Sequence, residues 1–285
     1  MKLYVVSGVS GSGKSTALHV FEDLEYYCID NLPVALLPSF AQEMANTSQN
    51  IPAKAAVGID ARNMAHDIQL FPATLERLKE IGILCEVIFL NADDSILLKR
   101  FSETRRKHPL TQNDLPLAEA IKKERKLLDP IANCADLFID TSHYNIHQLR
   151  DLIKTRVAAK PPQTFSVLIE SFGYKHGIPS DADFVFDVRC LPNPHWVPEL
   201  RNKLGTDTDV ANYLSSQPLV NQMYDDIKKF LEIWIPHFKA DNRSYITIAI
   251  GCTGGQHRSV YLAERIAKNL ASSYKNIITR HRELL

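Results

Sequence analysis

The residues best suited to chemistry lie in a glycine-rich stretch near the start of the chain. It reads GVSGSGKS and fits the phosphate-loop pattern G-x-x-x-x-G-K-[ST]. Glycines let the backbone turn tightly, so that successive N–H groups can face the phosphates of a nucleotide. Lys14 would place its charge on the β- and γ-phosphates, and Ser15 would offer a hydroxyl to Mg²⁺. We therefore predict a nucleotide-binding loop made of Gly8, Val9, Ser10, Gly11, Ser12, Gly13, Lys14 and Ser15.

A magnesium site of this kind also needs a carboxylate at the end of a neighbouring strand. Asp60 follows the short apolar run AAVGI, Asp30 ends YYCID, and Asp93 follows VIFLNA. We favour Asp60 as the carboxylate that holds the magnesium ion, and we interpret Lys14 and Asp60 as the catalytic residues. Asp30 could orient a nucleophile, and Asp93 could equally be the N-cap of a helix.

A basic stretch, FSETRRKHPL, contains Arg105, Arg106, Lys107 and His108. In small-molecule kinases, arginines on a mobile lid clamp the phosphoryl group that is transferred. The same residues could instead form a solvated basic loop, and the sequence leaves both readings open.

A second glycine-rich loop, GCTGGQHRS, follows the apolar run YITIAI and precedes a helical pattern. Its Cys252, Arg258 and Ser259 have the spacing of cysteine-dependent phosphatases, in which a thiolate lies in a loop of N–H groups. Gly251 stands where those enzymes usually have histidine, and no general-acid aspartate can be placed, so we expect no phosphatase activity. The loop, with Arg258 and His257 beside it, still predicts an anion site. The alternative is a structural turn with a buried thiol.

The elements that must position these loops alternate along the chain. Short apolar runs separated by helical patterns predict right-handed βαβ units and a mostly parallel sheet, which is an α/β fold. Strands are expected at Leu3–Val6, Tyr26–Ile29, Ala55–Ile59, Leu84–Leu90, Leu137–Ile139, Phe165–Ile169, Phe184–Val188, Tyr245–Ile250 and Asn276–Thr279. Helices are expected at Ser15–Leu24, Val34–Ala45, Asp67–Ile81, Asp94–Glu103, Leu115–Leu128, Ile146–Ala158 and Val260–Leu270, with two more between Phe184–Val188 and Tyr245–Ile250.

The two prolines in AAKPPQT, residues 158–164, interrupt this alternation and predict a stiff linker. We expect a P-loop nucleotide-binding domain of the kinase-like type over residues 1–158. A second, smaller α/β domain should occupy residues 159–285.

Composition excludes several classes of protein. Lysine plus arginine and aspartate plus glutamate each number 33, so no global charge indicates a nucleic-acid or membrane partner. No apolar stretch approaches the roughly 18 residues that a membrane helix needs, and the N-terminus does not have the pattern of a secretory signal. The five scattered cysteines favour reduced thiols in a cytoplasm, without a structural zinc site.

Six stretches together resemble one known family. They are GVSGSGKSTAL, YYCIDNLPVALLP, GIDARN, ESFGYKHGIPSDADFVFDVR, LPNPHW and AIGCTGGQHRSVYLAE. On these motifs, which span residues 1 to about 282, the chain is identified as similar to the RapZ family of bacterial nucleotide-binding proteins, also described as RNase adapter proteins.

The resemblance implies binding of ATP and GTP with Mg²⁺ and slow hydrolysis in the N-terminal domain. It assigns ATP to the loop Gly8–Ser15 and guanine nucleotide to Asp60, Ala61, Arg62 and Asn63. It makes the C-terminal domain a regulatory one that binds glucosamine 6-phosphate and a small RNA, and presents that RNA to an endoribonuclease. This implies post-transcriptional regulation by a protein that assembles into multimers. The implied sugar-phosphate pocket contains Arg189, His195, Thr253, Gly254, His257 and Arg258.

The RNA-binding tail is where the chain departs from the family. Well-studied members end in a denser lysine and arginine cluster, whereas here the basic residues are Lys268, Lys275, Arg280 and Arg282. Fewer phosphate contacts predict weaker and less salt-dependent RNA binding. The main alternative function is a small-molecule P-loop kinase, because a phosphate loop alone does not separate a kinase from a regulator.

Overall fold

The computed structural model describes residues 2–47, 54–105, 107–111, 115–158, 165–240, 243 and 245–284. The chain divides into two compact units, Met1–Ala159 and Lys160–Leu285. Residues 159–164, which include the two prolines of the expected linker, lie outside the described part. Each unit is a separate α/β body, which confirms the fold class expected from the alternating pattern.

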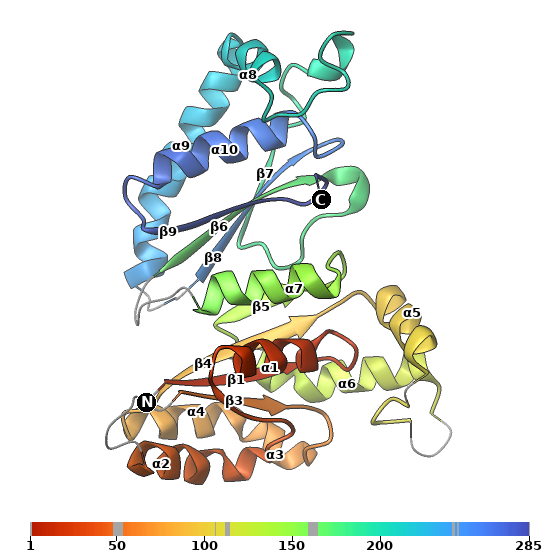
Figure 1. Ribbon diagram of the computed structural model, residues 1–285, viewed down its shortest axis with the longest axis vertical. Helices are drawn as coiled ribbons and strands as arrows, with labels where there is room; N and C mark the ends of the chain where they lie inside the picture. Colours follow the sequence, from red (N-terminus) through yellow and green to blue (C-terminus); the bar gives the residue numbers. More distant parts are fainter. Residues whose placement is uncertain are drawn as a thin grey trace. The chain divides into compact units, whose positions relative to one another are not determined.

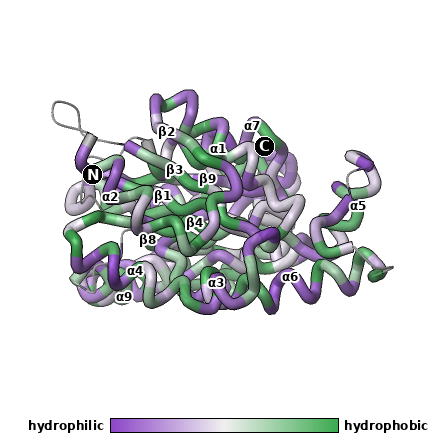
Figure 2. Tube along the Cα trace, turned by 90° about the horizontal axis from the view of Figure 1, so that it is seen from below, coloured by the Kyte–Doolittle hydropathy of each residue, from purple (hydrophilic) through white to green (hydrophobic). Residues whose placement is uncertain are grey.

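In the described residues, the first unit is built on a five-stranded parallel sheet in the order β2-β3-β1-β4-β5 (Figure 1). The strands are β1 (Lys2–Gly8), β2 (Tyr27–Ile29), β3 (Lys54–Ile59), β4 (Leu84–Asn91) and β5 (Leu137–Asp140). Leu3, Tyr4, Val5 and Val6 of β1 are fully buried, because helices cover both faces of a parallel sheet. Figure 2 shows the same feature, since β1, β3 and β4 are mainly hydrophobic whereas α6 alternates.

The helices of this unit are α1 (Lys14–Asp23), α2 (Leu37–Thr47), α3 (Ala65–Gln69), α4 (Phe71–Glu80), α5 (Asp94–Thr104), α6 (Leu117–Ala132) and α7 (Ile146–Ile153). Helices α1 and α7 pack together on one face of the sheet, whereas α2, α4 and α6 lie on the other (Figure 1). The single helix expected at Asp67–Ile81 is instead the pair α3 and α4. Pro72 at the start of α4 explains the break, because proline lacks the N–H and its ring clashes with the preceding turn.

The second unit contains a parallel sheet in the order β7-β8-β6-β9 within its described residues. The strands are β6 (Ser166–Gly173), β7 (Phe184–Asp187), β8 (Tyr245–Cys252) and β9 (Asn276–His281). Three α-helices, α8 (Thr208–Ser215), α9 (Pro218–Ala240) and α10 (Arg258–Leu270), accompany them in the described part, together with two 3₁₀ helices at Tyr174–His176 and Pro194–Trp196. Every residue of β6 and β8 is buried, so these strands form the centre of the unit.

Among the described residues, no helix combines the length and apolar character that a bilayer crossing requires.

Candidate functional site

The predicted phosphate loop connects the central strand β1 to the first turn of α1. Gly8 ends the strand and Lys14 begins the helix. Gly13, the residue that caps α1, has φ 102°, and a Cβ atom there would lie 2.5 Å from Cδ2 of Leu149. The backbone angle therefore favours glycine at this position, and a Cβ atom would also force the end of the Leu149 side chain to move.

The carbonyl groups of the loop are held by two residues that the sequence analysis missed. Arg100 of α5 donates from Nη1 to the carbonyl oxygen of Gly11 at 3.0 Å. Thr141, which follows β5 and is buried, donates its hydroxyl to the carbonyl of Ser12 at 2.9 Å. The carbonyl oxygens of Gly11 and Ser12 point toward Arg100 and Thr141. The N–H group of a peptide unit points opposite to its carbonyl, so the N–H groups of these peptide units point away from Arg100 and Thr141.

The N–H of Ser12 donates to the carbonyl of Val9 at 2.9 Å, whereas four other N–H groups of the loop remain available for a ligand. No described residue accepts a hydrogen bond from the backbone amides of Gly11, Gly13, Lys14 or Ser15. The Ser12 hydroxyl is buried and likewise has no partner in the described part of the chain. Unpaired donors at the positive end of α1 are the usual partners of phosphate oxygens, so the loop fits a nucleotide.

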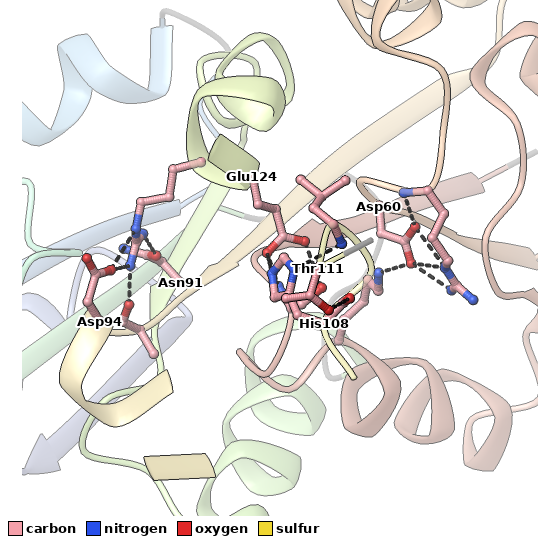
Figure 3. A network of polar contacts seen from close by, with 12 residues as sticks. Asp60, Asn91, Asp94, His108, Thr111 and Glu124 are labelled. Atoms are coloured by element: carbon pink, nitrogen blue, oxygen red, sulfur yellow. Dashed lines mark hydrogen bonds and ion pairs between the residues drawn. The ribbon is translucent and has the colours of Figure 1, made fainter. Parts of the chain in front are cut away.

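Asp60, labelled in Figure 3, directly follows β3, and its carboxylate contacts Lys14. Its Oδ2 atom accepts from Nζ of Lys14 at 2.5 Å and from Nη2 of Arg62 at 2.7 Å. Burial alone would raise the pKa of Asp60, but the hydrogen bonds from Arg62 and the charge of Lys14 outweigh it and lower the pKa to about 2. The carboxylate is therefore ionised at neutral pH and chemically suited to a hard cation such as Mg²⁺.

The segment Asp60–Asn63 is tied to the turn that follows β2. Asn63 accepts from the N–H of Val34 at 2.8 Å, and Ala61 is buried. Arg62 is half-exposed and lies 3.6 Å from Asp30, which is also half-exposed. Of the four residues expected to contact guanine nucleotide, Arg62 therefore has the side chain most available to a ligand.

A buried pair, Glu124 and His108, lies against the phosphate loop and was not assigned from the sequence (Figure 3). Glu124 of α6 accepts from the backbone N–H of Ser10 at 2.9 Å and from its hydroxyl at 2.7 Å. Nε2 of His108 lies 2.9 Å from Glu124, and Nδ1 of His108 accepts from the N–H of Leu110. Nε2 must therefore carry the proton and donate it to the carboxylate.

This placement corrects the interpretation of the basic stretch. His108 is buried and anchors the chain to Glu124, so it belongs neither to a solvated loop nor to a phosphate clamp. Arg105 and Lys107 are exposed, and Arg106 lies outside the described residues. Asp93 is exposed just ahead of α5, and its own N–H is bonded to the hydroxyl of Ser142.

The second glycine-rich loop joins β8 to α10, as the sequence predicted. Cys252 ends the strand, is buried, and its Sγ accepts from the N–H of Gly255 at 3.3 Å. Arg258, the first residue of α10, donates from Nη1 to the carbonyl groups of Arg189 and Leu191. These bonds hold the guanidinium over the loop, where Nη2 lies 3.3 Å from the Thr253 hydroxyl.

Oε2 of Glu283, which lies against Gly255, is buried without a partner in the described part of the chain, and so are two nitrogens of the loop itself. They are Nε of Arg258 and Nε2 of His257. Burial is the main reason that the pKa of His257 is lowered, and His195 is near enough to lower it further. The residues expected to bind a sugar phosphate are thus gathered around one loop, although Arg189 points its guanidinium at Asp187 and the ring of Tyr174.

The four residues expected to contact RNA differ in their exposure. Lys268 and Lys275 are exposed. Arg280 pairs with the buried Glu170 at 2.6 Å, and its side chain is 11% exposed. Arg282 is also largely buried, where it donates to the carbonyl of Gly177. The two arginines would have to leave these partners in order to contact phosphates.

A phosphate loop after the central strand, with an aspartate at the end of the adjacent strand, defines the class of P-loop proteins with a kinase-like parallel sheet. Comparison with family models identifies the particular family. The RapZ-like N-terminal domain matches residues 1–161, and the RapZ C-terminal domain matches residues 165–285. The chain belongs to the RapZ family, which confirms the resemblance found in its motifs.

Relatives with high identity span the whole chain. A protein of Nitrosococcus oceani is 56% identical over 284 residues, and one of Azotobacter vinelandii is 55% identical over 284 residues. Each comparison covers 100% of both chains, and both relatives are named nucleotide-binding protein.

Similar solved structures cover about half of the chain. A sugar kinase from Janibacter sp. HTCC2649 is 17% identical and covers 54% of this chain and 93% of its own, with a TM-score of 0.38. A shikimate kinase from Acinetobacter baumannii is 21% identical and covers 55% and 93%, with a TM-score of 0.35. At these TM-scores the two kinases carry no argument about which substrate this protein binds.

Proposed function

We propose that the protein is a regulatory nucleotide-binding protein that binds ATP or GTP in its first unit and a phosphorylated amino sugar in its second. The observation that carries the proposal is the set of unpaired N–H groups in the loop Gly8–Ser15, next to the Lys14–Asp60 ion pair. The names of its relatives support the nucleotide part.

Residues already in place would hold a magnesium nucleotide. The Ser15 hydroxyl and the Asp60 carboxylate would hold the ion, which would neutralise phosphate charge. Lys14 would exchange its bond with Asp60 for the phosphate oxygens, and Arg62 would remain to balance the carboxylate. Arg62, half-exposed beside Asp30, is the residue through which the segment Asp60–Asn63 would contact a guanine nucleotide.

Hydrolysis at this loop is expected to be slow. The acid nearest to the loop besides Asp60 is Glu124, and its carboxylate already accepts hydrogen bonds from the N–H and hydroxyl of Ser10 and from His108. With three hydrogen bonds on its roughly four acceptor sites, this carboxylate has little capacity left to orient a water molecule. Slow turnover suits a protein whose nucleotide acts as a signal.

In the second unit, the phosphate of glucosamine 6-phosphate would bind at Arg258 and the loop Thr253–His257, with His195 nearby. The sugar would change which macromolecule the unit engages. That macromolecule is a small RNA presented to an endoribonuclease, and its phosphates would contact the exposed Lys268 and Lys275.

Nucleotide binding is tested by titrating Mg-ATP and Mg-GTP into the wild type and into Lys14→Ala and Asp60→Ala. We expect both substitutions to weaken binding, because each removes one partner of the phosphate or the ion. Unchanged affinity in both variants would remove the proposal.

RNA binding is tested by filter binding at two salt concentrations. The wild type should lose affinity as salt rises, and a Lys268→Ala, Lys275→Ala variant should show a flatter dependence, because each lost phosphate contact lowers the slope by about 0.7 to 0.9. Absent or salt-independent binding would remove the RNA part and leave the nucleotide part standing.

A small-molecule kinase is the second candidate. Asp30 supports it, because this half-exposed carboxylate follows β2 and lies 3.6 Å from Arg62, close to the Lys14–Asp60 pair. Transfer of phosphate from ATP to a sugar or nucleoside, well above the rate of hydrolysis and lost in Asp30→Asn, would favour it.

A further inference from the structure

The thiol of Cys252 is buried, and its surroundings are unlike those of the half-buried Cys28 and Cys134. Its Sγ accepts from the N–H of Gly255 and lies 3.1 Å from the hydroxyl of Ser259, in the first turn of α10. Burial alone would raise its pKa, but the hydrogen bonds from Ser259 and Gly255 and the charge of Arg258 lower it below the ordinary value. In Cys28 and Cys134 burial instead raises the pKa.

The same loop has an unsatisfied cation. Nε of Arg258 is buried without a partner among the described residues, and the residue is 5% exposed. Bonds to the carbonyls of Arg189 and Leu191 use Nη1 and fix the guanidinium, which leaves Nε and Nη2 on the side of the Thr253 hydroxyl. A thiol with hydrogen-bond partners around it and a fixed arginine with an unpaired Nε are the two parts needed to hold and attack a phosphoryl group.

Packing explains why Gly251 replaces the histidine of cysteine phosphatases. A Cβ atom on Gly251 would lie 2.4 Å from the ring of Phe172 and 2.6 Å from the ring of Tyr174. Glycine is therefore required by the neighbouring strand, and its presence says nothing against a reactive thiol at the next residue.

Contrary to the expectation from the sequence alone, we infer from this geometry that Cys252 is a nucleophile that accepts a phosphoryl group from phosphate esters or anhydrides with good leaving groups, such as aryl or acyl phosphates. The inference rests on the anion site proposed above. In the first step the thiolate attacks phosphorus, an S–P bond forms, and the P–O bond to the leaving group breaks with its electron pair. In the second step water attacks phosphorus, the S–P bond breaks, the thiolate returns, and inorganic phosphate leaves with the protons of the water.

The restriction to good leaving groups follows from the state of Asp187. Asp187, which ends β7 beside Gly251, forms an ion pair with Arg189, and the hydrogen bonds of that pair keep its pKa below the usual value. It therefore has no proton to give to a departing alkoxide. A sugar 6-phosphate would bind at the loop without being consumed, which suits an effector, whereas an aryl or acyl phosphate can leave as a stable anion.

The test uses the full chain and measures phosphate release from p-nitrophenyl phosphate and acetyl phosphate. We compare the wild type with Cys252→Ser and with Cys134→Ser, a matched control in the first unit. Binding of inorganic phosphate to each protein is measured by calorimetry, and acid-quenched wild type is searched by mass spectrometry for a phosphoryl group on Cys252.

The inference predicts release by the wild type and Cys134→Ser, loss of release in Cys252→Ser with phosphate binding retained, and a phosphorylated Cys252. Equal release by wild type and Cys252→Ser, or phosphate binding without any release, would overturn it. Absence of phosphate binding by the wild type would overturn the anion site as well, so the two failures can be told apart.

Discussion

Charged side chains at the phosphate loop are each stabilised by partners from a different element. Asp60 from the end of β3 binds Lys14 of α1, and Glu124 of α6 binds Ser10 of the loop. Buried carboxylates are costly unless such donors compensate them, so the substitution of one partner should destabilise the protein as well as alter ligand binding.

Asp60 should make stability depend on pH in the acid range. Its pKa is lowered from 3.8 to about 2, so the folded state binds fewer protons than the unfolded state there. The stabilisation, about 2 kcal/mol, is fully present above the unfolded pKa and is lost as the pH falls through the folded pKa. Urea unfolding of wild type and Asp60→Asn should therefore differ at pH 7 and converge near pH 2. A constant difference over that range would contradict the account.

Glu124 should contribute to stability through its acceptor oxygens. Glu124→Ala would leave the N–H and hydroxyl of Ser10 and Nε2 of His108 unsatisfied, at a cost of about 3 kcal/mol. Glu124→Gln retains the size and one acceptor oxygen, so it should cost less. Both are measured as free energies of unfolding in urea, and equal losses below about 1 kcal/mol would show that the contacts contribute little.

At the scale of elements, the turn into α1 determines whether the loop can form. Gly13 has φ 102° and a Cβ atom there would meet the end of the Leu149 side chain, whereas Gly82 has φ 77° and open space around that position. The comparison separates backbone strain from steric clash, because both glycines have positive φ but only one is crowded.

Gly82→Ala should therefore cost about 1 to 2 kcal/mol, from backbone strain alone, and leave nucleotide affinity unchanged. Gly13→Ala should cost more, because the new methyl group also meets Leu149, and it should weaken Mg-ATP binding. Thermal unfolding and nucleotide titration of the two variants check this. Equal effects on both quantities would mean that the loop is not the nucleotide site.

The sequence was sufficient for the sheet strands and for the positions of both glycine-rich loops, because apolar runs and glycine spacing are local signals. The expected strands at Leu84–Leu90 and Tyr245–Ile250, for example, became β4 and β8 with small extensions. Glu124 could not be found in this way, because its contact with Ser10 joins residues that are 114 apart in the chain. The sequence around it, KERK, consists of charged residues and is typical of a solvent-exposed helix face. Arg280 was interpreted as a surface cation for the same reason, because its partner Glu170 lies on another strand.

At the scale of the whole molecule, each of the two compact units has a glycine-rich loop with donors that lack partners among the described residues, beside Lys14 in the first and Arg258 in the second. A regulatory role requires that the two sites influence each other. We expect glucosamine 6-phosphate to change the affinity for Mg-ATP, and Mg-ATP to change the sugar-phosphate affinity by the same factor. Identical affinities with and without the other ligand would remove the regulatory coupling.

The most direct measurement is a pair of calorimetric titrations, Mg-ATP and glucosamine 6-phosphate, on the wild type, Lys14→Ala and Arg258→Ala. The account predicts that Lys14→Ala loses ATP binding and keeps the sugar phosphate, whereas Arg258→Ala does the reverse. If Lys14→Ala bound Mg-ATP as tightly as the wild type, the loop Gly8–Ser15 would not be the nucleotide site and the account would be wrong.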